Sequence, residues 1–257
     1  MIILVKTNQK EIPMQSTTKK IALITGANKG IGLEVAHQLA ASGCTVLLGA
    51  RNQALGEQAA AKLAAESLDV RYLAIDLTVP ATIAAAAKRI ATGFGHLDIL
   101  VNNAGIIVAG DGPPATATLD SIESIFRVNF LGTVAVTQAM LPLLRKAPSA
   151  RIVNVSSGLG SLTQNNDPEW PYAIHKYLGY SASKAALNML TVQLAYELRD
   201  TAVKVNSADP GYTATDLNGY QGPQTIPEGA AEAIRLALLP DDGPSGTYSN
   251  SQGIVPW

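Results

Sequence analysis

Short apolar runs alternate with longer helical stretches along most of this chain, and that alternation constrains the fold more than any other feature. The stretches 53–67 and 79–90 are rich in alanine, a strong helix former. Strands that alternate with helices predict an α/β fold: one doubly wound domain, with a central parallel sheet of about seven strands and helices on both faces. The predicted strands lie at 21–25, 45–49, 70–75, 97–101, 151–155, 203–207 and, after a helix at 228–239, at 247–249.

The composition limits which partners and compartment we expect. Apolar residues make up 47% of the 257 residues, and the net charge of −1 gives no reason to expect nucleic acid or an anionic membrane as a partner. Cys44 is the only cysteine, which excludes an internal disulfide and favours a reducing, cytoplasmic location. We expect no membrane span, since no apolar run approaches the roughly 20 residues that one needs.

The polar stretch 1–18 shows no periodicity and contains Pro13. We expect it to be a loose tail, with Met14 as a possible start, and the single domain to span 19–257. The three histidines are scattered without partners, so we predict no metal site and no Ser-His-Asp triad. They are His37, His96 and His175.

A glycine-rich turn follows the first predicted strand. The segment TGANKGIG places Gly26, Gly30 and Gly32 between that strand and a helix. Such a turn presents bare backbone N–H groups and a helix N-terminus to a phosphate, and glycine is needed where a side chain would block a pyrophosphate. A simple tight turn could use the same glycines, but their position after the first strand favours a dinucleotide site.

The end of the second predicted strand bears on the choice of cofactor. An enzyme that prefers NAD is expected to carry an acid there for the adenosine ribose, but Ala50 occupies the place and Arg51 follows it. Arg51 and Lys29 could converge on the 2′-phosphate of NADP through charge-assisted contacts. Two solvated surface cations are the alternative. The position of Lys29 and Arg51 on neighbouring loops favours NADPH/NADP+ as the cofactor.

A tyrosine and a lysine stand four residues apart at two places. Tyr180 and Lys184 fall on a helix predicted over 177–199, so their side chains share a face. A free tyrosine has a pKa of about 10, and a neighbouring ammonium is expected to lower it and make the phenol a better acid. Tyr172 and Lys176 have the same spacing but lie among bulky neighbours.

An ordered set of motifs spans about residues 20–250. TGANKGIG, Asp76, NNAG at 102–105, Asn129, NVSS, YSASK and DPG together resemble the short-chain dehydrogenase/reductase family. The resemblance implies a Rossmann-type fold and an NADP(H)-dependent oxidoreductase acting on CH–OH or C=O groups. It also favours Tyr180 and Lys184 over the other pair, because small residues follow Tyr180 and the distance from Lys184 to DPG matches the family.

The resemblance gives roles to further residues. Ser157 would donate a hydrogen bond to the substrate carbonyl and to Tyr180, although a serine can also satisfy its own turn. Asn129 would hold a water that connects Lys184 to solvent, with a buried structural asparagine as the alternative. The predicted catalytic set is therefore Asn129, Ser157, Tyr180 and Lys184.

The predicted cofactor contacts extend over five loops and the helix that carries Tyr180. By resemblance, Asp76 would contact the adenine, and Thr213 and Thr215 would anchor the nicotinamide carboxamide. With Tyr180 and Lys184, the set comprises Gly26, Asn28, Lys29, Gly30, Ile31, Gly32, Arg51, Asn52, Asp76, Leu77, Asn103, Ala104, Gly105, Pro210, Gly211, Thr213 and Thr215.

The stretch between Ser157 and Tyr180 is longer than in many family members. The extra segment, near 163–176, contains turn formers and Trp170. A longer insertion here is a feature of monomeric carbonyl reductases, where it covers a helix that otherwise forms the oligomer interface, so the resemblance favours a monomer. We expect the substrate pocket between this segment and a loop near 216–227, with Ser157, Trp170, Tyr180, Tyr212 and Leu217 as contacts.

These observations predict NADPH-dependent reduction of a ketone or aldehyde, a small apolar or aromatic carbonyl compound, to an alcohol. One alternative is an NADP-dependent alcohol or steroid dehydrogenase working oxidatively, because the cellular cofactor ratio sets the direction. Another is a regulator that binds NADP without turnover. Such a protein could dispense with the tyrosine and lysine that this chain retains.

Overall fold

One sheet of eight strands runs through the described part of the chain. The computed structural model describes residues 19–257, and the expected tail at 1–18 lies outside them. The strand order is β3-β2-β1-β4-β5-β6-β7-β8, parallel throughout except for the antiparallel β8. The strands are β1 (Ile21–Thr25), β2 (Thr45–Ala50), β3 (Val70–Ala74), β4 (Ile99–Asn102), β5 (Arg151–Val155), β6 (Lys204–Ala208), β7 (Tyr248–Asn250) and β8 (Gly253–Ile254). The predicted α/β fold is confirmed, and β8 is an addition to it.

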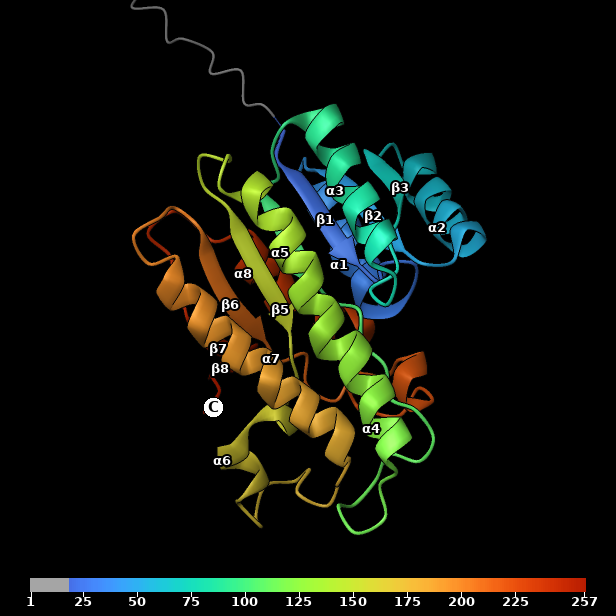
Figure 1. Cartoon of the computed structure of the whole chain (residues 1–257), viewed down its shortest axis with the longest axis vertical. Coiled ribbons are helices and arrows are strands. Elements are labelled where there is room, and N and C mark those ends of the chain that lie inside the picture. The colour runs from blue at the N-terminus through green and yellow to red at the C-terminus, as the bar shows by residue number, and fades with distance from the viewer. Residues whose placement is uncertain (1–18) are drawn as a thin grey trace, which may run out of the picture.

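Helices cover both faces of the sheet (Figure 1). One apolar cluster joins the sheet to α1, α2 and α8, and a second joins it to α3, α5 and α7. The helices are α1 (Gly30–Ala41), α2 (Gln53–Ala65), α3 (Pro80–Phe94), α4 (Leu119–Phe126), α5 (Thr133–Leu144), α6 (Leu162–Asn165), α7 (Leu178–Glu197) and α8 (Ile226–Ala237). Shorter turns are the π-helical η1 (Arg127–Gly132) and the 3-10 turns η2 (Gly158–Gly160) and η3 (Asp216–Asn218).

The central strands explain why this sequence forms a sheet covered on both faces. Every residue of β1, β2, β4 and β5 is buried, which matches their near-continuous apolar character. The strand order reverses between β1 and β4, and in open α/β sheets ligands bind at such a switch point, beyond the carboxyl ends of the strands.

One helical stretch corrects an expectation. The continuous run Leu119–Leu144, made of α4, η1 and α5, has 26 residues and contains an 18-residue apolar window with a mean hydropathy of 1.2, so by length and composition it could cross a membrane. The expectation that no segment is long enough is therefore wrong. The run packs against α3 and α7, and 44% of its apolar window is buried, so it also serves as a core helix.

Candidate active site

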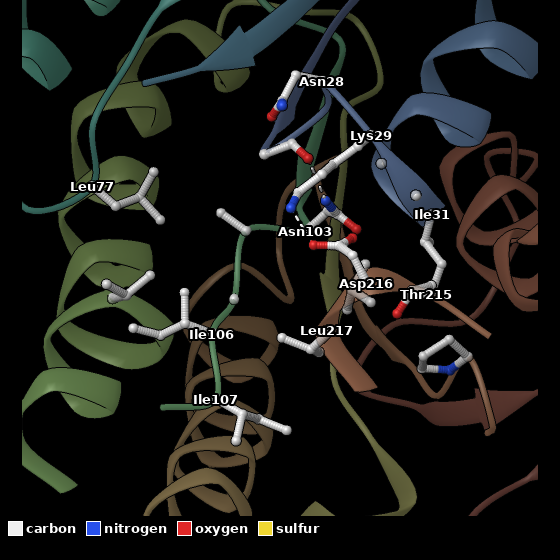
Figure 2. A pocket seen from close by; sticks show the side chains of 18 of the residues that line it. Asn28, Lys29, Ile31, Leu77, Asn103, Ile106, Ile107, Thr215, Asp216 and Leu217 are labelled. Atoms are coloured by element: carbon white, nitrogen blue, oxygen red, sulfur yellow. Dashed lines mark hydrogen bonds and ion pairs between the residues drawn. The ribbon is translucent and has the colours of Figure 1, made fainter. Parts of the chain in front are cut away.

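A cavity of about 400 Å³ lies at the carboxyl ends of the parallel strands. Side chains from the loops after β1, β3, β4 and β6 surround it, with Leu77 on one side and Asp216 and Leu217 on another (Figure 2). Most predicted cofactor residues line it, together with Leu217 of the predicted substrate set. They are Gly26, Asn28, Lys29, Gly30, Ile31, Gly32, Arg51, Asp76, Leu77, Asn103, Ala104, Gly105, Tyr180, Lys184, Pro210 and Thr215.

The glycine turn has no room for a side chain at Gly26 or at Gly32. Gly26 adopts a φ of +64°, and a Cβ there would lie 2.9 Å from the Cα of Ala104. A Cβ on Gly32 would collide with the Asn103 amide, whose Nδ2 donates hydrogen bonds to the carbonyls of Thr25 (2.9 Å) and Gly26 (3.2 Å). Asn103 thereby fixes the turn. The bare backbone at the start of α1 has the form that a dinucleotide pyrophosphate requires, so these residues fit such a cofactor.

The two predicted cations are placed differently from each other. Arg51 lines the cavity, is exposed and forms no ion pair with any residue of the described chain. Lys29 instead reaches across to η3, where its Nζ pairs with Asp216 (Figure 2). The side chains of Lys29 and Asp216 are 62% and 37% exposed, so this pair is weak enough to exchange partners. Arg51 is thus the free cation of the two, and Lys29 is opposed by an acid.

Three predicted cofactor residues do not line the cavity. Asn52 caps α2 by accepting a hydrogen bond from the amide of Leu55 (3.0 Å). Thr213 is buried beneath its turn, and its hydroxyl donates to the carbonyl of Pro210 (2.9 Å). Gly211 lies in that same turn with a φ of +67°. The geometry gives all three a local structural role.

Tyr180 and Lys184 are buried together on α7. They are 8% and 3% exposed, and Lys184 Nζ lies 5.5 Å from the centroid of the Tyr180 ring. Lys184 Nζ also donates a hydrogen bond to the carbonyl of Val155 at the end of β5 (2.8 Å). This approach needs Gly160, where a Cβ would lie 2.8 Å from the Cβ of Lys184. Both Tyr180 and Lys184 line the cavity.

The expected lowering of the tyrosine pKa is wrong. The pKa of Tyr180 is raised to about 12, chiefly by burial; within that value a hydrogen bond with Ser157 lowers the pKa and the charge of Asp209 raises it. Burial also lowers the pKa of Lys184 to about 8. Removing water penalises both charged forms, and in this pair that penalty outweighs the attraction between phenolate and ammonium.

Asn129 lies in the π-helical turn η1, between α4 and α5. Its Oδ1 accepts from the amide of Ile106 (2.8 Å), and its Nδ2 donates to the carbonyl of Ile106 (3.0 Å) and to the Ser183 hydroxyl (3.1 Å). Asn129 and Lys184 approach the same point beside Gly105. A Cβ on Gly105 would lie 3.5 Å from Lys184 Nζ and 3.6 Å from Asn129 Oδ1. π-helical turns occur frequently at functional sites.

The competing pair, Tyr172 and Lys176, is not arranged for proton transfer. Both residues lie in the loop before α7, and Lys176 is exposed, with its Nζ 3.4 Å from the carbonyl of Asn165. Tyr172 packs edge-on against Trp170 (5.5 Å between ring centroids) and Tyr212 (5.6 Å). With His175 and Tyr177 these rings form one aromatic cluster.

The predicted substrate residues Trp170 and Tyr212 therefore belong to this aromatic cluster and not to the cavity lining. Trp170 adjoins the turn that carries Ser157, because a Cβ on Gly158 would lie 3.0 Å from its ring. Ser157 is half-buried, and its Oγ accepts from the amide of Leu159 (3.2 Å). Trp170 is thus the member of the cluster that lies next to the Ser157 turn.

The sequence analysis missed Asp111. Its carboxylate accepts from the amides of Gly179 (2.8 Å) and Tyr180 (2.9 Å), and so caps the first turn of α7 from a loop 68 or more residues away. No local signal marks it, because helix-cap patterns are read from adjacent residues. It also missed further cavity-lining residues, namely Ile75, Ile106, Ile107, Val128, Val155, Ser156 and Asp216.

No group of three or more metal-ligating side chains occurs within residues 19–257. His37 faces Glu66 (3.2 Å) and His96 faces Asp98 (3.2 Å), as isolated pairs away from the cavity. His175 is stacked between Tyr172 and Tyr177 in the aromatic cluster.

Comparisons with known proteins agree with this geometry. Residues 20–225 match the family model described as short chain dehydrogenase. The chain is 38% identical over 230 residues to the short-chain dehydrogenase anuI of Penicillium roqueforti, covering 87% of this chain and 90% of that protein. It is 31% identical to carbonyl reductase [NADPH] 1 of Mus musculus, covering 94% and 100%.

Among solved structures, the NADPH-bound carbonyl reductase from chicken fatty liver superposes with a TM-score of 0.80 at 30% identity, covering 93% of this chain and 99% of that one. The fold, the ordered motifs and the match over most of the chain lead to one conclusion: this protein belongs to the short-chain dehydrogenase/reductase family and is an oxidoreductase acting on CH–OH/C=O groups.

Proposed function

We propose that this enzyme reduces a ketone or aldehyde to an alcohol with NADPH. The observation that carries the proposal is the buried Tyr180–Lys184 pair beside a cavity that begins at a glycine turn. The names of the mouse and chicken relatives, which specify carbonyl reduction and NADPH, support it. A cytoplasmic location is part of the proposal, since the one cysteine, Cys44, is buried and free.

The cofactor would lie along the strand ends and would supply a hydride to the carbonyl carbon. Gly26, Gly30 and Gly32 would hold its pyrophosphate, and Arg51 would bind the 2′-phosphate. Lys29 would reach that phosphate only by leaving Asp216. Ala50 is buried and carries no acid to repel a phosphate, which favours NADPH over NADH.

The proton comes from Tyr180. Ser157 and Tyr180 would both donate hydrogen bonds to the carbonyl oxygen, and Tyr180 would transfer its proton as charge develops there. The Lys184 ammonium stabilises the phenolate left behind, and Asn129 and Lys184 mark the route by which the proton is restored. Oriented groups of this kind lower the barrier because no reorganisation is needed at the moment of reaction.

The raised pKa of Tyr180 means that the resting site holds the proton that carbonyl reduction consumes. A phenol whose pKa is about 12 is protonated at neutral pH and is ready to act as an acid. An oxidation would need the phenolate as a base, and burial disfavours that form. Both directions pass through the same transition state, so the cellular cofactor ratio still sets which one prevails.

The aromatic cluster suggests the substrate class. Trp170 adjoins the turn that carries Ser157 and packs against Tyr172, while Leu217 and Ile107 line the cavity. An apolar or aromatic carbonyl compound would match these surfaces.

A panel of aromatic and aliphatic ketones and aldehydes tests the proposal, with the loss of reduced-nicotinamide absorbance followed for NADPH and for NADH. We expect turnover of at least one apolar carbonyl compound, with a higher kcat/KM for NADPH. Turnover only of alcohols with NADP+ would support the oxidative alternative. Tight NADP(H) binding without any turnover would identify a cofactor sensor.

A further inference from the structure

The peptide group between Ser157 and Gly158 is held at both of its polar atoms. The Tyr248 hydroxyl donates to the carbonyl of Ser157 (2.5 Å), and Asp209 Oδ1 accepts from the amide of Gly158 (2.9 Å). Both side chains are buried, Tyr248 at 1% and Asp209 at 7% exposure. Asp209 directly follows β6, and Tyr248 is the first residue of the neighbouring strand β7. Both therefore bind the loop after β5 from the same side of that loop.

These two hydrogen bonds fix the backbone that sets the orientation of the Ser157 side chain. Holding the plane of that peptide group fixes ψ of Ser157, and with it the direction in which its Cβ and hydroxyl point. The preceding residue is also held, because the amide of Ser156 donates to the carbonyl of Ala208 (2.7 Å). A hydroxyl misplaced by about 1 Å can cost about 100-fold in rate.

Tyr248 is itself held by the end of the chain. Its ring stacks on Trp257 (5.4 Å between centroids, 26° between planes), and its carbonyl accepts from the amide of Val255 (2.8 Å). The carbonyl of Trp257 accepts from the amide (3.1 Å) and hydroxyl (2.8 Å) of Thr163. Burial raises the pKa of Tyr248, so its hydroxyl remains a hydrogen-bond donor.

Asp209 has two effects: it binds the turn after β5, and its charge disfavours the Tyr180 phenolate that the proposed proton transfer forms. Its Oδ1 accepts a second hydrogen bond, from the amide of Gly211 (3.0 Å), which joins the turn after β6 to the turn after β5. Its charge raises the pKa of Tyr180 and so opposes formation of the phenolate. The negative charge of Asp209 therefore disfavours the Tyr180 phenolate, and its hydrogen bonds to the amides of Gly158 and Gly211 give the carboxylate a structural reason to be there.

We propose that Tyr248 and Asp209 are positioning residues that aim the Ser157 hydroxyl by holding both polar atoms of the Ser157–Gly158 peptide group. The inference rests on the proposed function, in which Ser157 contacts the carbonyl oxygen. Neither residue touches substrate in this account; each acts through Ser157.

A double-mutant cycle tests it. Tyr248→Phe removes one oxygen and keeps the ring that stacks on Trp257. We expect it to lower kcat by about 10- to 100-fold, less than the roughly 100- to 1,000-fold cost of removing a donor outright, because the serine is misaligned and not lost, while the KM for NADPH stays unchanged. In a Ser157→Ala background the same change should have no further effect, because the group being positioned is gone.

A readout independent of turnover separates this inference from the proposed function. Amide hydrogen exchange at Gly158 in the unliganded protein should be faster in Tyr248→Phe and in Asp209→Asn than in the wild type. Tyr196→Phe, on the exposed face of α7, is the matched control and should change neither kcat nor this exchange. If Tyr248→Phe does not fold, Asp209→Asn enters the same cycle in its place.

Equal loss of kcat in the wild-type and Ser157→Ala backgrounds would show a general structural effect and overturn the inference, as would unchanged exchange at Gly158. If the wild type reduces no carbonyl compound, the proposed function fails, and the exchange measurement still decides whether the two side chains hold this peptide group.

Discussion

Lys184 is buried, yet the proposed proton transfer depends on its charge. Because burial lowers its pKa to about 8, the ammonium is largely lost as the pH rises above that value. We expect kcat/KM for carbonyl reduction to be level near neutral pH and to fall about tenfold per pH unit above about pH 8. A pH–rate profile with NADPH measures this. Lys184→Arg, which stays charged, should be slower but should lack that fall; the same fall in both proteins would assign it to another group.

Arg51 and Asp216 set the charge that meets the cofactor. Arg51→Asp removes a charge-assisted contact and should lower kcat/KM for NADPH by about 10- to 100-fold while raising it for NADH. Asp216→Asn frees Lys29 from an exposed ion pair, so it should improve kcat/KM for NADPH by up to about fivefold without affecting NADH. Steady-state kinetics of both variants with NADPH and with NADH test these two predictions. Parallel changes for NADPH and NADH would show that neither residue discriminates between them.

The N-terminus of α7 carries Tyr180, the proposed proton donor, and is capped from outside the helix. Asp111→Ala removes the acceptor for the amides of Gly179 and Tyr180, and should cost about 1–2 kcal/mol of stability and also lower kcat. Urea unfolding and kcat measure the two effects. Thr118→Ala removes a comparable cap from α4, where the threonine accepts from the amide of Ser121 (3.2 Å), and should lower stability alone. Equal losses of kcat in both variants would contradict a specific role for Asp111.

Elements with a strong local pattern could be predicted closely. The helix expected at 177–199 is Leu178–Glu197, and the strand expected at 151–155 is Arg151–Val155. The misses need contacts between distant residues or the effect of burial. The cap by Asp111, the ion pair of Lys29 with Asp216 and the raised pKa of Tyr180 all arise only after folding. The π-helical turn at Asn129 has no recognisable sequence pattern.

At the scale of the whole molecule, the insertion near 163–176 bears on assembly. It lies beyond the carboxyl ends of the strands, beside α6 and the C-terminus (Figure 1). α7 leaves Met189, Val192 and Tyr196 exposed, a surface that an oligomer would cover. The prediction remains a monomer of 26.8 kDa. Size-exclusion chromatography with light scattering measures the mass directly, and a stable tetramer would refute the prediction.

Tyr180 is the residue on which the whole account depends, and the chain supplies its own control in Tyr172. Tyr180→Phe removes the proposed proton donor and should lower the kcat of carbonyl reduction by at least about 100-fold, with folding and NADPH affinity retained. Tyr172→Phe, in the aromatic cluster, should leave kcat within about threefold of the wild type, since it loses no donor to the reacting oxygen. Turnover with NADPH and a responsive ketone, beside an NADPH titration, gives the answer. Loss of activity in Tyr172→Phe with activity retained in Tyr180→Phe would contradict the proposed mechanism.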